Sequence, residues 1–167
     1  MGQPPNFIDG HQHIHQLPVV RDAILKVIAS KSFKDKVWLR ASGEPLVKTL
    51  RRGISIGRTM AIGVLGKSFK KLAARSGLIT NDVLIGSYNY QSERMGVEIL
   101  SKFLQNTQDG TLMYFHPGYN DPVLETRDIL TTHRESELEI VISDSFLKIL
   151  ASADVRLARG TDVYLQP

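Results

Sequence analysis

Short apolar segments alternate with amphipathic segments along almost the whole sequence. Because neighbouring parallel strands need a crossover connection, which is usually a helix, this alternation restricts the possible folds more than any other feature. It predicts an α/β fold: a partial (β/α) barrel in which a parallel sheet of about five strands has flanking helices. The predicted strands cover residues 7–15, 36–40, 82–90, 110–119 and 155–158.

Helical patterns lie between these strands, with apolar residues recurring every three or four positions. Residues 53–66 include four glycines, and we expect them to form a loop. In parallel sheets the functional side chains gather at the carboxyl ends of the strands. The predicted helices cover residues 19–31, 67–75, 95–105 and 136–153, with a helical turn at residues 44–50.

The composition narrows the chemistry that this chain can perform. A length of 167 residues suits a single domain, 1–167. The absence of cysteine excludes disulfides, thiolate metal sites and cysteine nucleophiles, so any metal must be held by His, Asp or Glu. No dinucleotide-binding glycine motif, P-loop or serine-nucleophile motif occurs. No apolar run could span a membrane and no signal segment is present, so we expect a cytoplasmic protein without a membrane span.

Basic charge is concentrated in residues 45–81, which contain eight Lys and Arg residues and no acidic residue. Such a stretch could meet phosphate, nucleic acid or an acidic protein surface. A solvated basic helix beside a loop is the simpler interpretation.

Four ionisable residues occupy alternate positions at the end of the first predicted strand: Asp9, His11, His13 and His15. Side chains alternate between the faces of a strand, so these four are expected to point the same way. Neutral imidazole is a common ligand for divalent metals, and a nearby carboxylate can act as a ligand or orient one. The pattern therefore predicts a metal or catalytic site rather than an exposed polar face.

Further candidates end or line other predicted strands. His116 ends the fourth one, and Pro117 restricts its backbone, which suits a positioned proton donor or acceptor. Arg40 ends the second strand, where a buried cation needs an anionic partner. It could orient a carboxylate, bind substrate or form a structural salt bridge. Tyr88 and Tyr90 could stack against a sugar or pack in the core.

Three segments resemble the YdjC-like carbohydrate deacetylases (ChbG/HpnK type). The segment FIDGHQHIHQLP resembles the central motif of that family, D-[SG]-H-x-H-x-H followed by a nearby Pro. The segment FHPGYND is similar to a later C-H-P-[AG]-[YF]-x-D element, with Phe115 in place of the usual Cys. The segment beginning RESELE resembles a C-terminal helix and closing strand. The resemblance covers residues 5–163, about the C-terminal two thirds of the family's length.

The resemblance implies a distorted (β/α) barrel that removes N-acetyl groups from amino sugars or oligosaccharides by means of a divalent metal, Mg²⁺ first and Zn²⁺ second. It implies that His11 is a metal ligand, that His116 is a general acid and that Arg40 is a catalytic residue close to them. The other residues that it places at or beside the site are Asp9, His13, His15, Tyr119 and Asp121.

The sequence departs from the family in one respect. The initial A-D-D-F-G strand, which supplies the base and a metal-binding Asp, and a second metal-binding His do not occur here. We therefore expect a partial barrel without its N-terminal strands, a fragment or inactive short form with one of three metal ligands. The expected partner is an N-acetylated sugar, with no nucleic acid and with a homodimer possible. The alternatives are a non-catalytic binding module that uses the basic residues 45–81, and another His-rich metallohydrolase.

Overall fold

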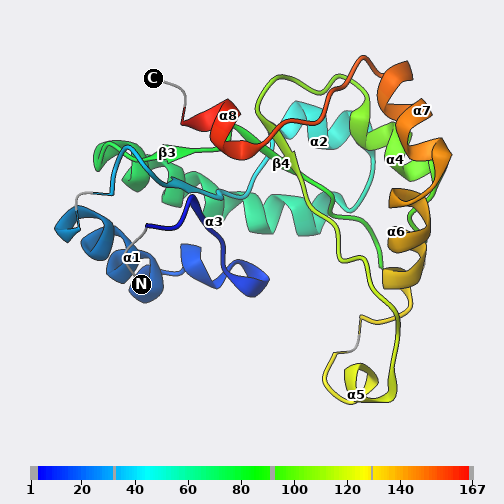
Figure 1. The fold of residues 1–167 in the computed structure, drawn as a ribbon, viewed down its shortest axis with the longest axis horizontal. Coiled ribbons are helices and arrows are strands. Elements are labelled where there is room, and N and C mark those ends of the chain that lie inside the picture. Colours follow the sequence, from blue (N-terminus) through cyan, green and yellow to red (C-terminus); the bar gives the residue numbers. More distant parts are fainter. Residues whose placement is uncertain (1–3, 32, 91–92, 129, 166–167) are drawn as a thin grey trace.

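The computed structural model describes residues 4–31, 33–90, 93–128 and 130–165, and strands and helices alternate through most of them (Figure 1). The mixed α/β class with parallel strands is therefore confirmed. The elements in chain order are β1 Phe7–Ile8, the 3-10 helix η1 His11–Gln16, α1 Pro18–Ser30, β2 Trp38–Leu39, α2 Leu46–Arg52, α3 Ile56–Arg75, β3 Ile79–Thr80, β4 Val83–Ile85, α4 Val97–Leu104, β5 Thr111–Met113, α5 Pro122–Glu125, α6 His133–Val141, α7 Asp144–Ser152 and α8 Gly160–Tyr164.

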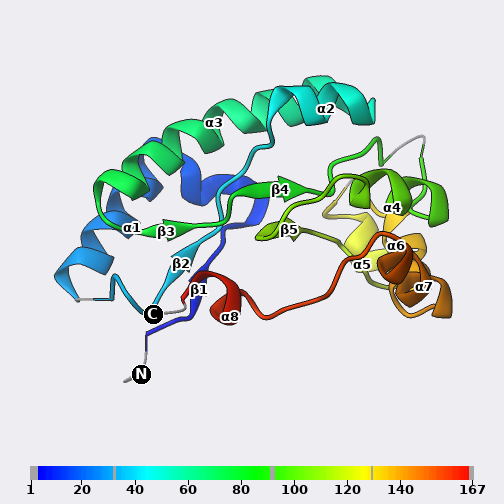
Figure 2. The same ribbon diagram turned by 90° about the horizontal axis from the view of Figure 1, so that it is seen from above.

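The strands pair in two small parallel sheets. One has the order β1-β2-β3, and the other consists of β4 and β5. Helix α3 runs along one side of these strands and α8 lies on the other side (Figure 2). The described residues form no closed barrel, so that part of the expectation is not confirmed.

The buried side chain of Asn81 joins the two sheets. Its Oδ1 accepts a hydrogen bond from the backbone N–H of Ala41 (2.7 Å), and its Nδ2 donates to the carbonyl of Ala41 (3.0 Å). Just beyond it, the N–H of Leu84 donates to the carbonyl of Gly43 (3.0 Å). The Asn81 amide therefore replaces the ladder hydrogen bonds at the point where β3 gives way to β4, and it satisfies backbone groups that would otherwise be buried unpaired.

Several predicted elements differ from the structure. The strands predicted over residues 82–90 and 110–119 are shorter, Val83–Ile85 and Thr111–Met113. The first strand ends at Ile8 rather than at residue 15. Residues 155–158 pair with no strand in the described part of the chain: Val155 packs on a buried cluster, and Leu157 is exposed. The single helix predicted over residues 136–153 is two helices, because the Ser143 side chain accepts from Phe146 N and caps a new helix there.

The prediction of a loop at residues 53–66 is wrong for most of that range, because α3 begins at Ile56. Glycine usually weakens a helix, but it also lets a helix approach another backbone closely. A Cβ added to Gly66 would overlap the carbonyl group of Ser42. The glycine therefore serves the packing of α3 against the segment that follows β2.

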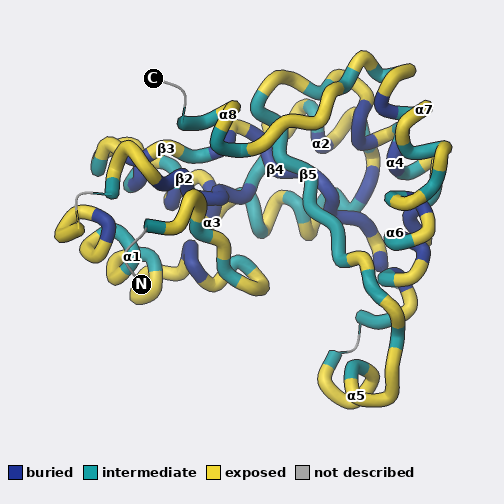
Figure 3. Tube along the Cα trace, in the orientation of Figure 1, coloured by how far each residue is buried: buried dark blue, intermediate teal, exposed yellow. Residues whose placement is uncertain are grey.

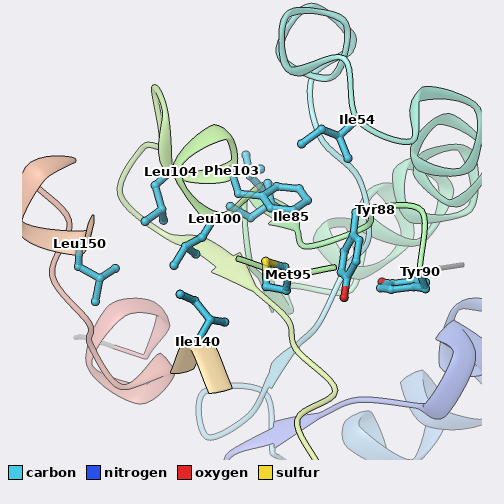
Figure 4. Close-up of a cluster of buried hydrophobic side chains, with 11 residues drawn as sticks. Ile54, Ile85, Tyr88, Tyr90, Met95, Leu100, Phe103, Leu104, Ile140 and Leu150 are labelled. Carbon is cyan, nitrogen blue, oxygen red and sulfur yellow. The ribbon is translucent and has the colours of Figure 1, made fainter. Parts of the chain in front are cut away.

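The buried side chains form two clusters, and Figure 3 shows them as dark segments around the strands. The first connects α1, β2 and α3, and it includes Ile28, Leu39 and Phe69. The second connects β4 with α4, α6 and α7, and Tyr88 and Tyr90 lie at one edge of it (Figure 4). Within the described ranges, no helix is both long and apolar enough to cross a membrane.

The approach of α3 to Ser42 can be tested with two alanine substitutions on the same helix. Gly66→Ala should lower the free energy of unfolding by at least about 2 kcal/mol, because the backbone at Ser42 has to move. In the matched control Gly63→Ala, the new methyl meets only the Cα of Gly43 at 3.8 Å. This control should raise stability by about 0.5–1 kcal/mol through helix propensity. Urea denaturation compares the two, and equal effects would contradict the packing described.

Candidate functional site

The His-rich segment is a tight turn rather than a strand. Within η1, Gln12 and His13 have φ angles of 51° and 65°, which lie in the left-handed region. The prediction of a strand over residues 9–15, with the ionisable side chains on one face, is therefore wrong. The turn sends His11 and His15 to different surroundings: His11 is exposed, and His15 is buried.

Arg40 organises this turn. Its guanidinium forms an ion pair with the Asp9 carboxylate and donates to the carbonyl of Gly10 (3.2 Å). Its Nη1 also donates to Nδ1 of His13 (2.7 Å). One buried cation therefore holds three points of the turn, which is the role of orienting residue and salt-bridge partner that the sequence left open. Both terminal nitrogens of the guanidinium make these contacts, so Arg40 positions other groups.

His15 and Gln16 fix the end of the turn from behind. The N–H of Gly10 donates to Nδ1 of His15 (2.9 Å), so the proton of the ring lies on Nε2, which donates to the carbonyl of Arg40 (2.6 Å). The Gln16 amide accepts from the N–H of Ser42 (3.0 Å) and donates to its Oγ (2.7 Å). His15 is 1% exposed and does not line the cavity described below, so the structure gives it a structural place.

Burial and the neighbouring Arg40 charge lower the pKa of His13 to about 4. The imidazole is therefore neutral at neutral pH, and its Nδ1 can accept the hydrogen bond from Arg40. Nδ1 of His13 and a carboxylate oxygen of Asp9 thus both contact the Arg40 guanidinium.

A cavity of about 450 Å³ lies in front of the turn. His11 and His13 line one part of it, and His116, at the end of the segment after β5, lines another. The fold thus brings the His-rich turn and His116 to the same cavity. The remaining lining residues are Asp9, Gly10, Gln12, Arg40, Arg58, Ile62, Tyr90, Tyr114, Phe115 and Leu130.

A buried carboxylate holds His116. The backbone N–H of His116 donates to Oε2 of Glu137, and the His116 Nδ1 lies 3.7 Å from Oε1 of the same carboxylate. The hydroxyl of Tyr88 donates to that Oε1 (2.8 Å). The Glu137 side chain is 1% exposed, whereas the His116 side chain is 37% exposed and reaches the cavity. The backbone of His116 is therefore held by Glu137, while its imidazole reaches the cavity.

The charge of Glu137 is maintained despite its burial. Burial raises the pKa of this carboxyl, but hydrogen bonds from His116 and Tyr88 outweigh it, so the pKa lies below its usual value. Neither Glu137 nor the buried His133 was predicted as a site residue; the only signal available was their spacing of four residues on one face of a helix.

Aromatic rings form a further wall of the cavity. The edge of the His116 ring meets the Tyr90 and Tyr114 rings, with centroids 5.5 Å and 5.4 Å away. The guanidinium of Arg58 lies over the Tyr90 ring at 5.1 Å. Of the two tyrosines considered from the sequence, Tyr90 lines the cavity and Tyr88 supports Glu137 from the core.

The chain matches the model of the YdjC-like protein family over residues 1–152. It belongs to that family. The resemblance inferred from the His-rich segment, from FHPGYND and from the C-terminal helix is therefore confirmed.

A solved structure has the same fold. A proposed cellobiose-phosphate cleavage protein from Enterococcus faecalis V583 superposes with a TM-score of 0.66 at 15% sequence identity. The superposition covers 98% of this chain and 54% of that protein, so this chain spans about half of its length. No curated protein sequence matches this chain significantly.

Two residues that the family resemblance placed at the site lie elsewhere. Tyr119 is 79% exposed, and the Asp121 side chain accepts from the N–H of Leu124 (2.8 Å) as the N-cap of α5. Neither lines the cavity. Helix α5 lies at the tip of an excursion between β5 and α6 (Figure 1).

The metal site of the family is not completed by the residues that the structure describes. His11 offers an imidazole to the cavity, but the neighbouring carboxylate of Asp9 is paired with Arg40, and His13 accepts from the same guanidinium. The described residues that do group as ligands are His116, His133 and Glu137, and His11 is not among them. A single exposed imidazole does not fit a resident metal, so no step is derived through one here.

Several basic residues of the 45–81 stretch make contacts within the molecule. Arg52 pairs with the buried carboxylate of Glu44, and Lys48 donates to the carbonyl of Asn106 (3.1 Å). Lys70 also donates to a backbone carbonyl. These contacts stabilise the packing of α2 and α3, so part of the charge in this stretch has a structural use.

The structural role of His15 can be tested by comparing its substitution with that of the exposed His11. His15→Ala should lower the free energy of unfolding by about 2–4 kcal/mol, because it leaves a cavity and two unpaired backbone groups. The control His11→Ala should change it by less than about 0.5 kcal/mol. Urea denaturation at pH 7 measures both, and a larger effect at His11 would contradict this assignment.

The stabilisation by His15 should also depend on pH. Burial lowers the pKa of His15, so the folded protein keeps this ring neutral, while the unfolded chain takes up a proton below about pH 6.5. The stabilisation by His15 is complete above that pH and is lost as the pH falls. The difference in stability between the natural protein and His15→Ala should therefore narrow from pH 7 to pH 5.

Proposed function

We propose that this chain forms the sugar-binding and proton-donating part of a carbohydrate deacetylase, a hydrolase that removes N-acetyl groups from amino sugars or oligosaccharides. The observation that supports this most strongly is the pair His116–Glu137 in the cavity wall. The imidazole reaches the cavity, and its Nδ1 lies 3.7 Å from a buried carboxylate. Membership of a family of carbohydrate-processing hydrolases gives the reaction class.

Hydrolysis of an acetamide needs a proton for the departing amine. Histidine is the side chain whose ordinary pKa allows proton transfer near neutral pH. The Glu137 carboxylate holds this residue in place, since it accepts from the backbone N–H of His116 and its Oε1 lies 3.7 Å from the ring Nδ1. We assign His116 as the general acid and Glu137 as the residue that positions it.

The aromatic wall of the cavity suits a sugar ring. Pyranose rings pack their C–H faces on aromatic side chains, and the Tyr90 and Tyr114 rings border the cavity beside His116. The neutral His13 and the exposed His11 supply polar atoms at the far side. Arg40 keeps these two histidines in place through its contacts with the turn.

Dependence on a divalent metal, Mg²⁺ or Zn²⁺, is part of the proposal through family membership. His11 is the residue of this chain that would contribute to it, and the described residues supply no second ligand next to it. A metal held by His11 together with ligands from outside the described residues would supply an activated water nucleophile.

The proposal can be tested in the natural protein that contains this sequence. Acetate release from N-acetylglucosamine oligosaccharides is measured as kcat and KM separately. His116→Asn should lower kcat by about 10²–10⁴-fold, the range expected for loss of a general acid. Glu137→Gln keeps the shape but removes the charge beside the imidazole, so it should lower kcat with KM little changed.

The matched control is Glu98→Gln. Glu98 lies on α4 with its side chain 81% exposed and pairs with Lys102, an exposed contact of little energetic value. This variant should keep full activity. If His116→Asn releases acetate as fast as Glu98→Gln, the assignment of His116 is wrong; if the natural protein releases none from any N-acetylated amino sugar, the proposed reaction is wrong.

A further inference from the structure

Three side chains from two separate stretches meet behind the His116 ring. His133 and Glu137 stand one turn apart on α6, and His116 approaches them from the segment after β5. One nitrogen or oxygen from each lies within 4.8 Å of the others. His133 is 2% exposed, and its ring centroid lies 5.5 Å from that of His116.

Two nitrogens in this group are buried without a partner. Nδ1 of His116 and Nδ1 of His133 have no hydrogen bond in the described part of the chain. A buried polar atom left unpaired costs roughly 1–3 kcal/mol, so native proteins seldom leave two of them side by side. Beside them lies the Glu137 carboxylate, and its charge is not neutralised by a lysine or arginine contact in the described residues. A cation at this point would satisfy all three side chains.

The separations suit a small divalent ion. Zn²⁺ binds His nitrogen and carboxylate oxygen in a tetrahedral arrangement that places ligand atoms roughly 3.4 Å apart. The His116 Nδ1 and the Glu137 Oε1 are 3.7 Å apart. Two imidazoles with one carboxylate form a ligand set that leaves a fourth position for water, and imidazole favours Zn²⁺ over Mg²⁺ or Ca²⁺.

We propose that His116, His133 and Glu137 form a Zn²⁺-binding site, separate from His11. Burial lowers the pKa of His133, and the pKa of Glu137 also lies below its ordinary value, so a neutral imidazole and a charged carboxylate are available to a cation at neutral pH. An ion bound here occupies the side of His116 that faces Glu137. The inference therefore goes beyond the proposed deacetylase reaction, and the binding of Zn²⁺ at this site does not depend on that reaction.

Binding is tested on the 167-residue chain, stripped with EDTA and titrated with ZnCl₂ in a calorimeter. The natural sequence should bind one Zn²⁺ with a Kd of about 10 μM or tighter. His133→Phe, which keeps a ring of similar shape, and Glu137→Gln should each weaken binding at least about tenfold. His11→Ala is the control and should bind as the natural sequence does. No binding, or binding lost in His11→Ala, would overturn the proposal.

A second measurement does not depend on the folding of any variant. Long-range ¹H–¹⁵N NMR spectra of the natural sequence report each imidazole nitrogen directly. Addition of Zn²⁺ should shift the Nδ1 resonances of His116 and His133 and leave those of His11 unchanged. Shifts confined to His11 and His13 would place the ion at the turn and contradict the proposal.

Discussion

The arrangement of the site depends on the buried guanidinium of Arg40. The turn that carries the His-rich segment has no strand partner, and its backbone enters the left-handed region at Gln12 and His13. Such a conformation persists only where surrounding contacts determine it. The ion pair with Asp9 and the hydrogen bonds to Gly10 and His13 are those contacts. A buried cation without them would be strongly unfavourable, so turn and arginine stabilise each other.

A second buried charge, the Glu137 carboxylate, positions a residue on the other wall of the cavity. Glu137 accepts one hydrogen bond from the Tyr88 hydroxyl, which lies in the core, and one from the backbone N–H of His116, in the segment after β5. Two histidines that line the cavity, His13 and His116, thus each contact a buried charged side chain. This arrangement suits a catalytic site, in which reacting groups must be fixed without their reactive atoms being consumed. The same arrangement leaves two imidazole nitrogens facing Glu137, which is the basis of the proposed Zn²⁺ site.

Sequence alone indicated the α/β class, the family and the meeting of His116 with the His-rich segment, because apolar periodicity marks elements and chemical residues follow strand ends. It failed where distant contacts override local preference. The period of two at residues 9–15 suggested a strand, but contacts with Arg40, some 27 residues away from His13, impose a turn. The glycines of residues 53–66 suggested a loop, although Gly66 is needed for helix packing against Ser42. Both contacts join segments that are remote in sequence.

The central claim is that the cavity between the turn and His116 receives an N-acetylated amino sugar. The most direct test is a crystal structure of the natural protein soaked with an N-acetylglucosamine oligosaccharide. The account predicts a sugar ring against Tyr90 and Tyr114, with its acetamide nitrogen within about 3.2 Å of the His116 imidazole. A sugar bound elsewhere on the molecule, or one whose acetamide points away from His116, would contradict it.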